Sequence, residues 1–224
     1  MLNVAATLAA APPSLTHTDH CLLRGRLGAA GGVTVVPGVP DANIVVALAL
    51  EATSNYVSAT RQVCVRSDGA EGRGGVPRRA LTSAGGGPVQ DALYASPMLN
   101  GLLSSLCGAR VLPSGNRGSY SYYVEPGDFL DVHLDIPTCD VTLITVLDDK
   151  APGGESGGAL EAFPLAVGAP LSMIREHGYP GGRVVKAEPG QSIVILGGLV
   201  PHRVLALKAG GQRVISALCF KCQG

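Results

Sequence analysis

Apolar and polar residues alternate along most of the chain after residue 118. A period of two is the pattern of a half-buried β-strand, and the Gly, Pro and Asp residues that bound most of these runs favour turns. The eight runs are SYSYYV, DFLDVHLDI, DVTLITVLD, GALEAFPLAV, GRVVKAE, QSIVILGG, HRVLAL and RVISALCF. So many short strands in succession predict a mainly β fold, a jelly roll or sandwich, rather than a parallel sheet with helical crossovers.

The chain before residue 110 has a different pattern. In SPMLNGLLSSLCG, Ser96 can cap a helix, Pro97 suits its first turn, apolar residues follow at helical spacing, and Gly108 can end it. The stretch DANIVVALALEATSN fits either a buried strand or a helix. The stretches RSDGAEGRGGVPRR and SAGGGPVQ predict loops. We therefore expect helices and loops here that brace the β core.

No charge-rich or Ser-rich segment divides the 224 residues. The sequence predicts a single domain, residues 1–224, in which a helical and loop region, residues 1–110, packs on a β core, residues 118–221. The opening MLNVAATLAAAPPS is apolar, but no basic residue precedes its apolar run and it is too short to cross a bilayer. We expect no signal peptide and a cytoplasmic protein.

The balance of charged residues indicates which kinds of molecule the protein can bind. Lys and Arg together number 17, and so do Asp and Glu. The basic residues are scattered, which disfavours binding to nucleic acid or to an anionic membrane surface. We expect a small neutral or zwitterionic molecule as the ligand. Nothing in the pattern indicates an oligomeric state.

Six cysteines occur at irregular spacings. In an intracellular chain this pattern predicts reduced thiols buried as small apolar side chains. Cys219 and Cys222, in CFKCQG, form the one close pair, which could be half of a zinc site or a redox pair. No second pair and no helical pattern follows, and both features argue against those roles.

The segment GDFLDVHLDIPT contains the most informative polar residues. Alternation places His133 and Asp135 on one face of a strand. His202 stands between two apolar strand patterns, where a β roll can bring it opposite His133. Arg213 begins the last strand and requires an anion if it is buried. Two His and one carboxylate form the ligand set of non-haem Fe(II) oxygenases.

Other interpretations of these residues exist. His133 and Asp135 alone could be a hydrogen-bonded couple in the core. A second His-x-Asp, His17 and Asp19 in LTHTDHC, lacks a strand pattern and suits a loop or helix cap. The Gly-rich APGGESGG lacks the Lys-Ser/Thr and helix of a phosphate loop, and we interpret it as a connection between strands.

Taken together, His133, Asp135, His202 and Arg213 resemble the motif of the Fe(II)/2-oxoglutarate-dependent dioxygenases, in particular their prolyl-hydroxylase-like branch. YVEPGDFLDVHLD, GGALEAFP and GGLVPHRVLALKAGGQRVISALCF are similar to strands of that branch. The resemblance covers about residues 94–220. It implies a double-stranded β-helix core, jelly-roll or cupin-like, braced by the N-terminal helices.

The resemblance also implies a site. His133, Asp135 and His202 would bind Fe(II), and Arg213 would bind the distal carboxylate of the co-substrate 2-oxoglutarate. Tyr123 matches the position of a Tyr that assists Arg213, with Tyr120 and Tyr122 as rivals if a bulge changes the phase. Ser216 would face away from Arg213. With O₂, the expected reaction is hydroxylation of an unactivated C–H bond, giving succinate and CO₂, with desaturation or ring formation as alternative outcomes. Related radical halogenases have Gly or Ala where Asp135 stands, so halogenation is not expected.

The sequence favours a free amino acid or a natural-product intermediate as the substrate and leaves a protein side chain open as an alternative. Near the expected mouth, a carboxylate could be held by Tyr120, Tyr122, Arg117, Arg175 and His177. Two further classes remain: a cupin-type metalloenzyme that does not use 2-oxoglutarate, and a non-catalytic jelly-roll binding module.

Overall fold

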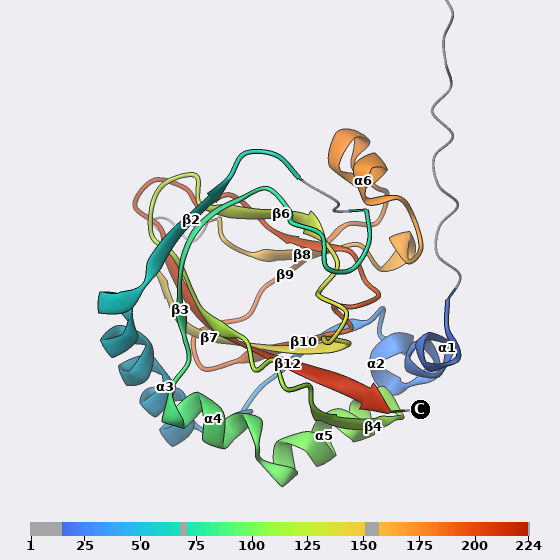
Figure 1. The fold of residues 1–224 in the computed structure, drawn as a ribbon, viewed down its shortest axis with the longest axis horizontal. Helices are drawn as coiled ribbons and strands as arrows, with labels where there is room; N and C mark the ends of the chain where they lie inside the picture. The colour runs from blue at the N-terminus through green and yellow to red at the C-terminus, as the bar shows by residue number, and fades with distance from the viewer. Residues whose placement is uncertain (1–14, 68–70, 151–156, 224) are drawn as a thin grey trace, which may run out of the picture.

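The computed structural model describes residues 15–67, 71–150 and 157–223. Within these ranges, strands form one antiparallel sheet in the order β1-β10-β7-β12-β5-β3-β6-β11-β8-β9, with β2 beside β3 and β4 beside β12. The sheet curls until it nearly closes into a barrel (Figure 1). The strands are β1 (Val33–Val36), β2 (Thr60–Cys64), β3 (Arg79–Gly85), β4 (Arg110–Pro113), β5 (Ser119–Tyr123), β6 (Phe129–His133), β7 (Val141–Lys150), β8 (Leu160–Ala162), β9 (Arg183–Val185), β10 (Ser192–Ile195), β11 (His202–Val204) and β12 (Gln212–Gln223).

Each of the eight runs read from the alternating pattern contains one strand, β5 to β12. The predicted mainly β fold is therefore confirmed, with an architecture consistent with a jelly roll. The expectation of only helices and loops before residue 110 is wrong, because β1, β2 and β3 lie there and join the sheet. β1 and β2 are short and β3 overlaps the predicted loop SAGGGPVQ, so a pattern of alternation was not evident.

Helices cover the outside of this barrel. The helical elements are α1 (His17–Arg24), α2 (Arg26–Ala29), α3 (Ala42–Asn55), η1 (Tyr56–Ser58), α4 (Pro88–Tyr94), α5 (Pro97–Cys107), η3 (Pro164–Ala166) and α6 (Leu171–His177). The ambiguous stretch after Asp41 is helical, and the Asp41 side chain accepts hydrogen bonds from the backbone amides of Asn43 and Ile44 at its N-terminus. Among the described residues, no helix is long and apolar enough to cross a membrane.

α5 has the predicted ends. The Ser96 side chain accepts a hydrogen bond from the Leu99 amide, and Gly108 adopts the left-handed conformation that ends the helix. Its buried residues Leu99 and Leu103 belong to the main core with Phe220 of β12. Farther along the same outer surface, α3 packs on Tyr120 and Tyr122 of β5. α3, α4 and α5 thus form a layer on one side of the barrel (Figure 1), as expected for a helical brace.

The bonding of two cysteines differs from the expectation of reduced thiols. Cys139 and Cys219 form a disulfide between the loop after β6 and strand β12, so the prediction that all six thiols are reduced is wrong for this pair. Cys222 is buried beside Cys107. Residues three apart in a strand face opposite sides of the sheet, so Cys219 and Cys222 cannot act together as a zinc half-site or redox pair. Sequence spacing could not reveal the Cys139 partner, because the two cysteines are 80 residues apart.

Candidate metal centre

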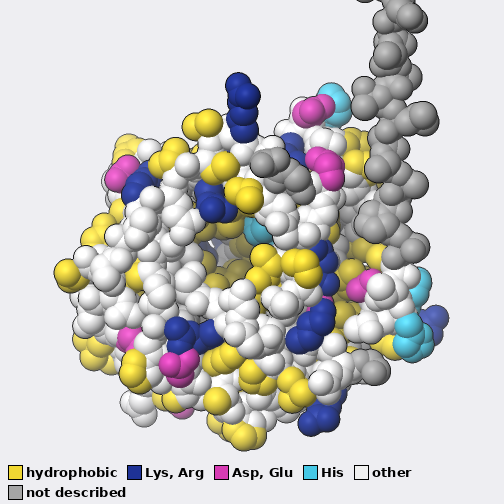
Figure 2. Space-filling view, viewed as in Figure 1, with side chains coloured by type: hydrophobic (Ala, Val, Ile, Leu, Met, Phe, Trp, Pro, Cys, Tyr) yellow, Lys and Arg dark blue, Asp and Glu magenta, His cyan; other side chains and the backbone are white. Residues whose placement is uncertain are grey.

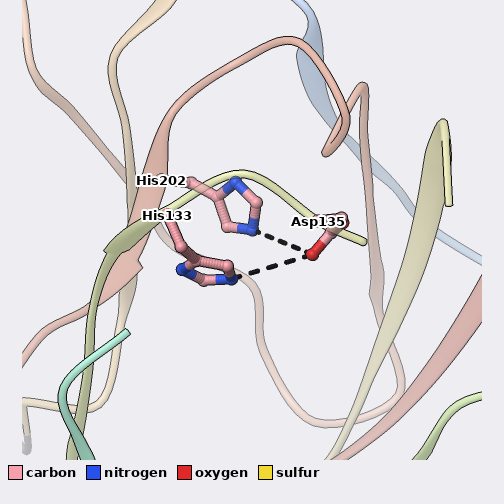
Figure 3. A group of neighbouring side chains, drawn as sticks. All are labelled: His133, Asp135 and His202. Carbon is pink, nitrogen blue, oxygen red and sulfur yellow. Dashed lines mark ion pairs between the residues drawn. The ribbon is translucent and has the colours of Figure 1, made fainter. Parts of the chain in front are cut away.

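His133 and His202 come from neighbouring strands. His133 ends β6 and stands directly opposite His202 of β11, with ring centroids 4.3 Å apart. The register shifts between His202 and Val204, which leaves Leu130 paired with Val204 and on the same face as both histidines. Asp135 follows two residues after His133, and its carboxylate lies to one side of the two rings and faces Nε2 of both (Figure 3). One ligand atom from each of the three residues lies within 4.8 Å of the others.

Backbone contacts orient both imidazoles. His133 Nδ1 is 2.8 Å from the carbonyl oxygen of Asp131, and His202 Nδ1 is 2.9 Å from that of Val200. A carbonyl only accepts, so each Nδ1 carries the proton and donates. Nε2 of each ring faces Asp135 Oδ1, at 3.7 Å from His133 and 3.6 Å from His202. This tautomer leaves Nε2 of each ring with a lone pair that could bind a metal ion, and fixes Nδ1–H on a backbone carbonyl, as in many metal sites.

Asp135 is held from its other side. The Thr142 hydroxyl donates to Asp135 Oδ2 over 2.5 Å, and the Asp135 amide donates to the Gly197 carbonyl over 2.8 Å. A Cβ at Gly197 would come within 1.8 Å of Oδ2, so only glycine allows this approach. Oδ1 is thereby left to face the histidines. These contacts favour a carboxylate with one oxygen reserved for a cation.

The protonation equilibria of the three residues are coupled. Burial, followed by repulsion from His202, lowers the pKa of His133 to about 4. Burial alone would raise the pKa of Asp135, but the two histidines and the Thr142 hydroxyl outweigh it and hold that pKa below its usual range. Burial opposes protonation of His202, yet attraction and hydrogen bonding to Asp135 raise its pKa. The pocket is therefore built for a positive charge next to Asp135.

Arg213 and Tyr123 lie farther along the same inner face. Arg213 of β12 stands directly opposite Tyr123 of β5, and both side chains are almost fully buried. The Arg213 guanidinium forms an ion pair with Asp149 of β7. Tyr123 belongs to the main core inside the barrel. Figure 2 shows a hollow at the centre of the barrel with a histidine side chain visible inside it.

Three predicted substrate residues lie away from the triad. The hydroxyls of Tyr120 and Tyr122 donate to Glu51 and to the Ala52 carbonyl of α3, on the outside of the sheet. Strand alternation then puts Tyr123 inside, which removes the two rivals for the position next to Arg213. Arg117 forms an ion pair with Asp91 of α4. The expectation that these three line the substrate site does not agree with the structure. The Ser216 hydroxyl accepts a hydrogen bond from Gln90 of α4, so it does face away from Arg213.

The two remaining substrate candidates, Arg175 and His177, lie in different surroundings. Arg175 of α6 donates to the carbonyl oxygen of Val132, the residue before His133, and pairs with Glu71. His177 at the end of the same helix is exposed, and its Nε2 lies 3.8 Å from the carboxylate of Glu176. The structure therefore brings Arg175 close to the triad and leaves His177 at the surface.

The competing motif at the N-terminus is a helix cap. The Thr16 side chain and Asp19 exchange hydrogen bonds across the first turn of α1, and His17 lies at the helix start. Among the described residues, the group that could hold a metal ion consists of His133, Asp135 and His202 and includes neither His17 nor Asp19, which agrees with the cap interpretation. Most of APGGESGG, and all of the N-terminal segment MLNVAATLAAAPPS, lie outside the described residues.

Sequence reasoning missed several groups around Asp135. Arg73 donates to the carbonyl oxygens of Ile136 and Cys139, over 2.9 and 2.6 Å, and pairs with Asp140. The Cys139 sulfur lies 3.2 Å from the Thr142 hydroxyl. Arg73 falls in a Gly-rich stretch, and Thr142 in an ordinary strand pattern. Neither position carries a local signal, because their role depends on contacts formed only in the folded chain.

The fold is similar to that of solved iron-dependent oxygenases. A prolyl-4-hydroxylase from Pseudomonas putida has a TM-score of 0.52 and 19% identity, with 88% of this chain and 96% of that chain covered. A 2OG-Fe(II) oxygenase family protein from Burkholderia pseudomallei has a TM-score of 0.56 and 14% identity, with 93% and 91% covered. The alpha-ketoglutarate-dependent epimerase SnoN from nogalamycin biosynthesis has a TM-score of 0.58 and 16% identity, with 85% and 78% covered.

No protein-family model and no curated protein sequence matches the chain. At these identities the similarity establishes the fold. The chain has the fold of the Fe(II)/2-oxoglutarate oxygenases, as the resemblance of its motifs predicts.

Proposed function

We propose that this chain is an Fe(II)- and 2-oxoglutarate-dependent oxygenase that hydroxylates an unactivated C–H bond of a small molecule, with succinate and CO₂ as co-products. The observation that carries the proposal is the convergence of His133, Asp135 and His202 inside a barrel of this fold. His133 and His202 would each offer Nε2 to the metal, and Asp135 would offer Oδ1. Three ligands on one face leave open positions for a co-substrate and O₂.

When bound, Fe(II) supplies O₂ activation coupled to oxidative decarboxylation of 2-oxoglutarate. The chain's own part is orientation. The Nδ1 contacts of the histidines fix their rings, and Thr142 fixes the carboxylate. The residues fit the ion, because two neutral imidazoles and one carboxylate neutralise half its charge and leave it electrophilic. The presence of Asp135, where radical halogenases have a small residue, favours hydroxylation over halogenation.

Arg213 would bind the distal carboxylate of 2-oxoglutarate, assisted by the Tyr123 hydroxyl. A guanidinium has five donors, so Arg213 can keep its contact with Asp149 and still form a bidentate pair with a second carboxylate. Its burial inside the barrel strengthens such a pair by excluding water. Tyr123 faces Arg213 across the sheet, and among the described residues no group hydrogen-bonds its hydroxyl.

Three finer points stay predictions. Similar structures include a prolyl-4-hydroxylase and an epimerase, so the fold does not specify a small-molecule substrate. The balanced charge and scattered basic residues support one, with no nucleic acid or membrane as partner. A cytoplasmic location also stays a prediction, and the Cys139–Cys219 disulfide, a bond typical of oxidising compartments, speaks against it. The single domain over residues 1–224 also stays a prediction.

One experiment separates this proposal from its alternatives. Anaerobic addition of Fe(II) and then 2-oxoglutarate should produce the visible charge-transfer band of a bidentate iron chelate. Iron binding without that band would instead support a cupin-type enzyme that does not use 2-oxoglutarate. Absence of tight iron binding would support a non-catalytic binding module. In air, release of succinate that requires both iron and 2-oxoglutarate completes the test.

A further inference from the structure

Arg79 shares a face of the sheet with the candidate metal ligands. Arg79 of β3 stands opposite Leu130 of β6, and Leu130 stands opposite Val204 of β11. Paired residues in antiparallel strands point to the same side, and so do residues two apart in one strand. Val204 is two residues after His202, which itself faces His133. The Arg79 side chain therefore points to the inner side of the barrel, as the triad does.

The Arg79 guanidinium has no partner among the described residues. Its Nε is buried and makes no hydrogen bond, and no ion pair involves its terminal nitrogens. The other arginines around the triad each have a carboxylate: Arg73 has Asp140, Arg175 has Glu71 and Arg213 has Asp149. A partly buried cation without a counter-ion is costly unless a ligand supplies the anion.

The neighbouring residue provides a contrast. Arg78, which directly precedes β3, donates from Nε to Asp131 over 2.8 Å, and its guanidinium lies over the Phe129 ring. Its charge is satisfied within the protein. The two consecutive arginines therefore differ in their partners. The Arg78 guanidinium is paired within the protein, whereas the Arg79 guanidinium points to the interior of the barrel and has no partner among the described residues.

The position of Arg79 relative to the iron site fits a small substrate. Leu130 and His133 are three residues apart, or about 10 Å along a strand, and Arg79 lies about 5 Å across the sheet from Leu130. An extended arginine side chain at position 79 can span much of the distance between the Cα atoms of Arg79 and His133. Arg79 is on the side of β6 opposite to β11, whereas Arg213 lies farther along the barrel beside Tyr123. The two arginines could thus hold two different anions.

Two residues that precede β3 contact the surroundings of the triad. Glu71 contacts Ser172 and Arg175 of α6, and Arg73 binds the backbone just after Asp135. Glu71 and Arg73, which precede β3, thus lie against α6 and against the loop that follows β6. Figure 2 shows Lys or Arg side chains around the rim of the central hollow.

We propose that Arg79 binds a carboxylate of the substrate and so selects small organic acids, such as free amino acids, for oxidation at the iron site. This inference rests on the proposed function. A single unsatisfied guanidinium matches one negative charge, which favours a carboxylate over a dianionic phosphate ester. Binding this end of the acid would orient a C–H bond at its other end toward the metal.

The test uses Arg79→Gln, with Arg78→Gln as the matched control and Arg79→Lys as the conservative variant. The probes are free amino acids and simple organic acids, each paired with its neutral amide, and their phosphate-ester analogues. One readout is the change in the anaerobic Fe(II)–2-oxoglutarate band on adding each probe. The other readout is 2-oxoglutarate consumption in air. Retention of the band in Arg79→Gln without a probe shows that this variant is folded and binds both cofactors.

We expect at least one acid, but not its amide, to perturb the band and accelerate 2-oxoglutarate consumption by the wild type. Arg79→Gln should raise the half-saturating concentration of that acid by about 10- to 100-fold, with the KM for 2-oxoglutarate unchanged. Arg79→Lys should restore part of the affinity, and Arg78→Gln should behave as the wild type.

Five results would overturn the inference while the proposed function stands. They are an unchanged response to acids in Arg79→Gln, a rise in the KM for 2-oxoglutarate instead, equal responses to acids and amides or a preference for phosphate esters, and no response to any acid although the chelate forms. If the wild type forms no chelate, the proposed function fails and this inference fails with it.

Discussion

His133 Nε2 and His202 Nε2 face the same oxygen, Asp135 Oδ1, from 3.7 and 3.6 Å. Each ring is fixed at Nδ1 by the carbonyl of the residue two positions earlier, so the two histidines are presented in the same way from adjacent strands.

Asp135→Ala should abolish tight iron binding. The substitution removes the one anionic ligand, and we expect a loss in Fe(II) affinity larger than the ~10- to 100-fold typical of losing an outer-sphere partner. Anaerobic titration with Fe(II) measures it. His17→Ala, in the capping motif of α1, is the control and should bind iron as the wild type does. Unchanged affinity in Asp135→Ala would contradict the assignment of the site.

Iron affinity should fall as the pH is lowered below the pKa of His202. Asp135 raises that pKa above 6.5, whereas His133, with a pKa of about 4, is already neutral in this range. Because Fe(II) must displace one proton from His202, the apparent association constant should fall about tenfold per pH unit between pH 5 and that pKa. Titrations at several pH values measure the slope, and an affinity independent of pH would count against His202 as a ligand.

Thr142→Val should weaken iron binding without removing a ligand. The variant loses the hydroxyl that donates to Asp135 Oδ2, so the carboxylate is less firmly oriented. We expect a decrease of about 10- to 100-fold in Fe(II) affinity. Thr145→Val is the matched control, because the Thr145 hydroxyl contacts Ser192 and not Asp135. Equal effects of the two substitutions would indicate general destabilisation instead.

Arg213→Gln should raise the KM for 2-oxoglutarate. Removal of the buried guanidinium eliminates a charge-assisted contact with the distal carboxylate, and we expect an increase of about 10- to 100-fold. Arg203→Gln serves as the control, since Arg203 pairs with Glu161 and lies over the Phe163 ring. Succinate release at varied 2-oxoglutarate concentrations gives both constants. A KM that stays the same in Arg213→Gln would exclude Arg213 from co-substrate binding.

Cys139→Ser and Cys219→Ser should each lower the free energy of unfolding by about 2–4 kcal/mol, because either change opens a disulfide that closes a long loop. Denaturant titration measures the change. Reduction of the wild type should lower stability by a similar amount, while Cys222→Ser, outside the disulfide, should not remove the effect of reductant. Stability of the wild type that does not respond to reductant would show that the bond is not formed.

The sequence by itself determined the strands and the local faces. Alternation predicted that His133 and Asp135 point the same way, and Ser96 and Gly108 predicted where α5 begins and ends, whereas the stretch after Asp41 fitted either a helix or a strand. These features depend on neighbours a few residues apart, and such information is contained in the local pattern.

Only the tertiary structure decided which distant residues meet. The register of β6 with β11 placed His202 opposite His133, and the pairing of β5 with β12 selected Tyr123 over Tyr120 and Tyr122. The same long-range packing joined Cys139 to Cys219 and left Arg79 facing inward, with no partner for its Nε among the described residues. Strand register is set by the whole sheet, by its bulges and by the helices packed on it, so no local pattern can encode it.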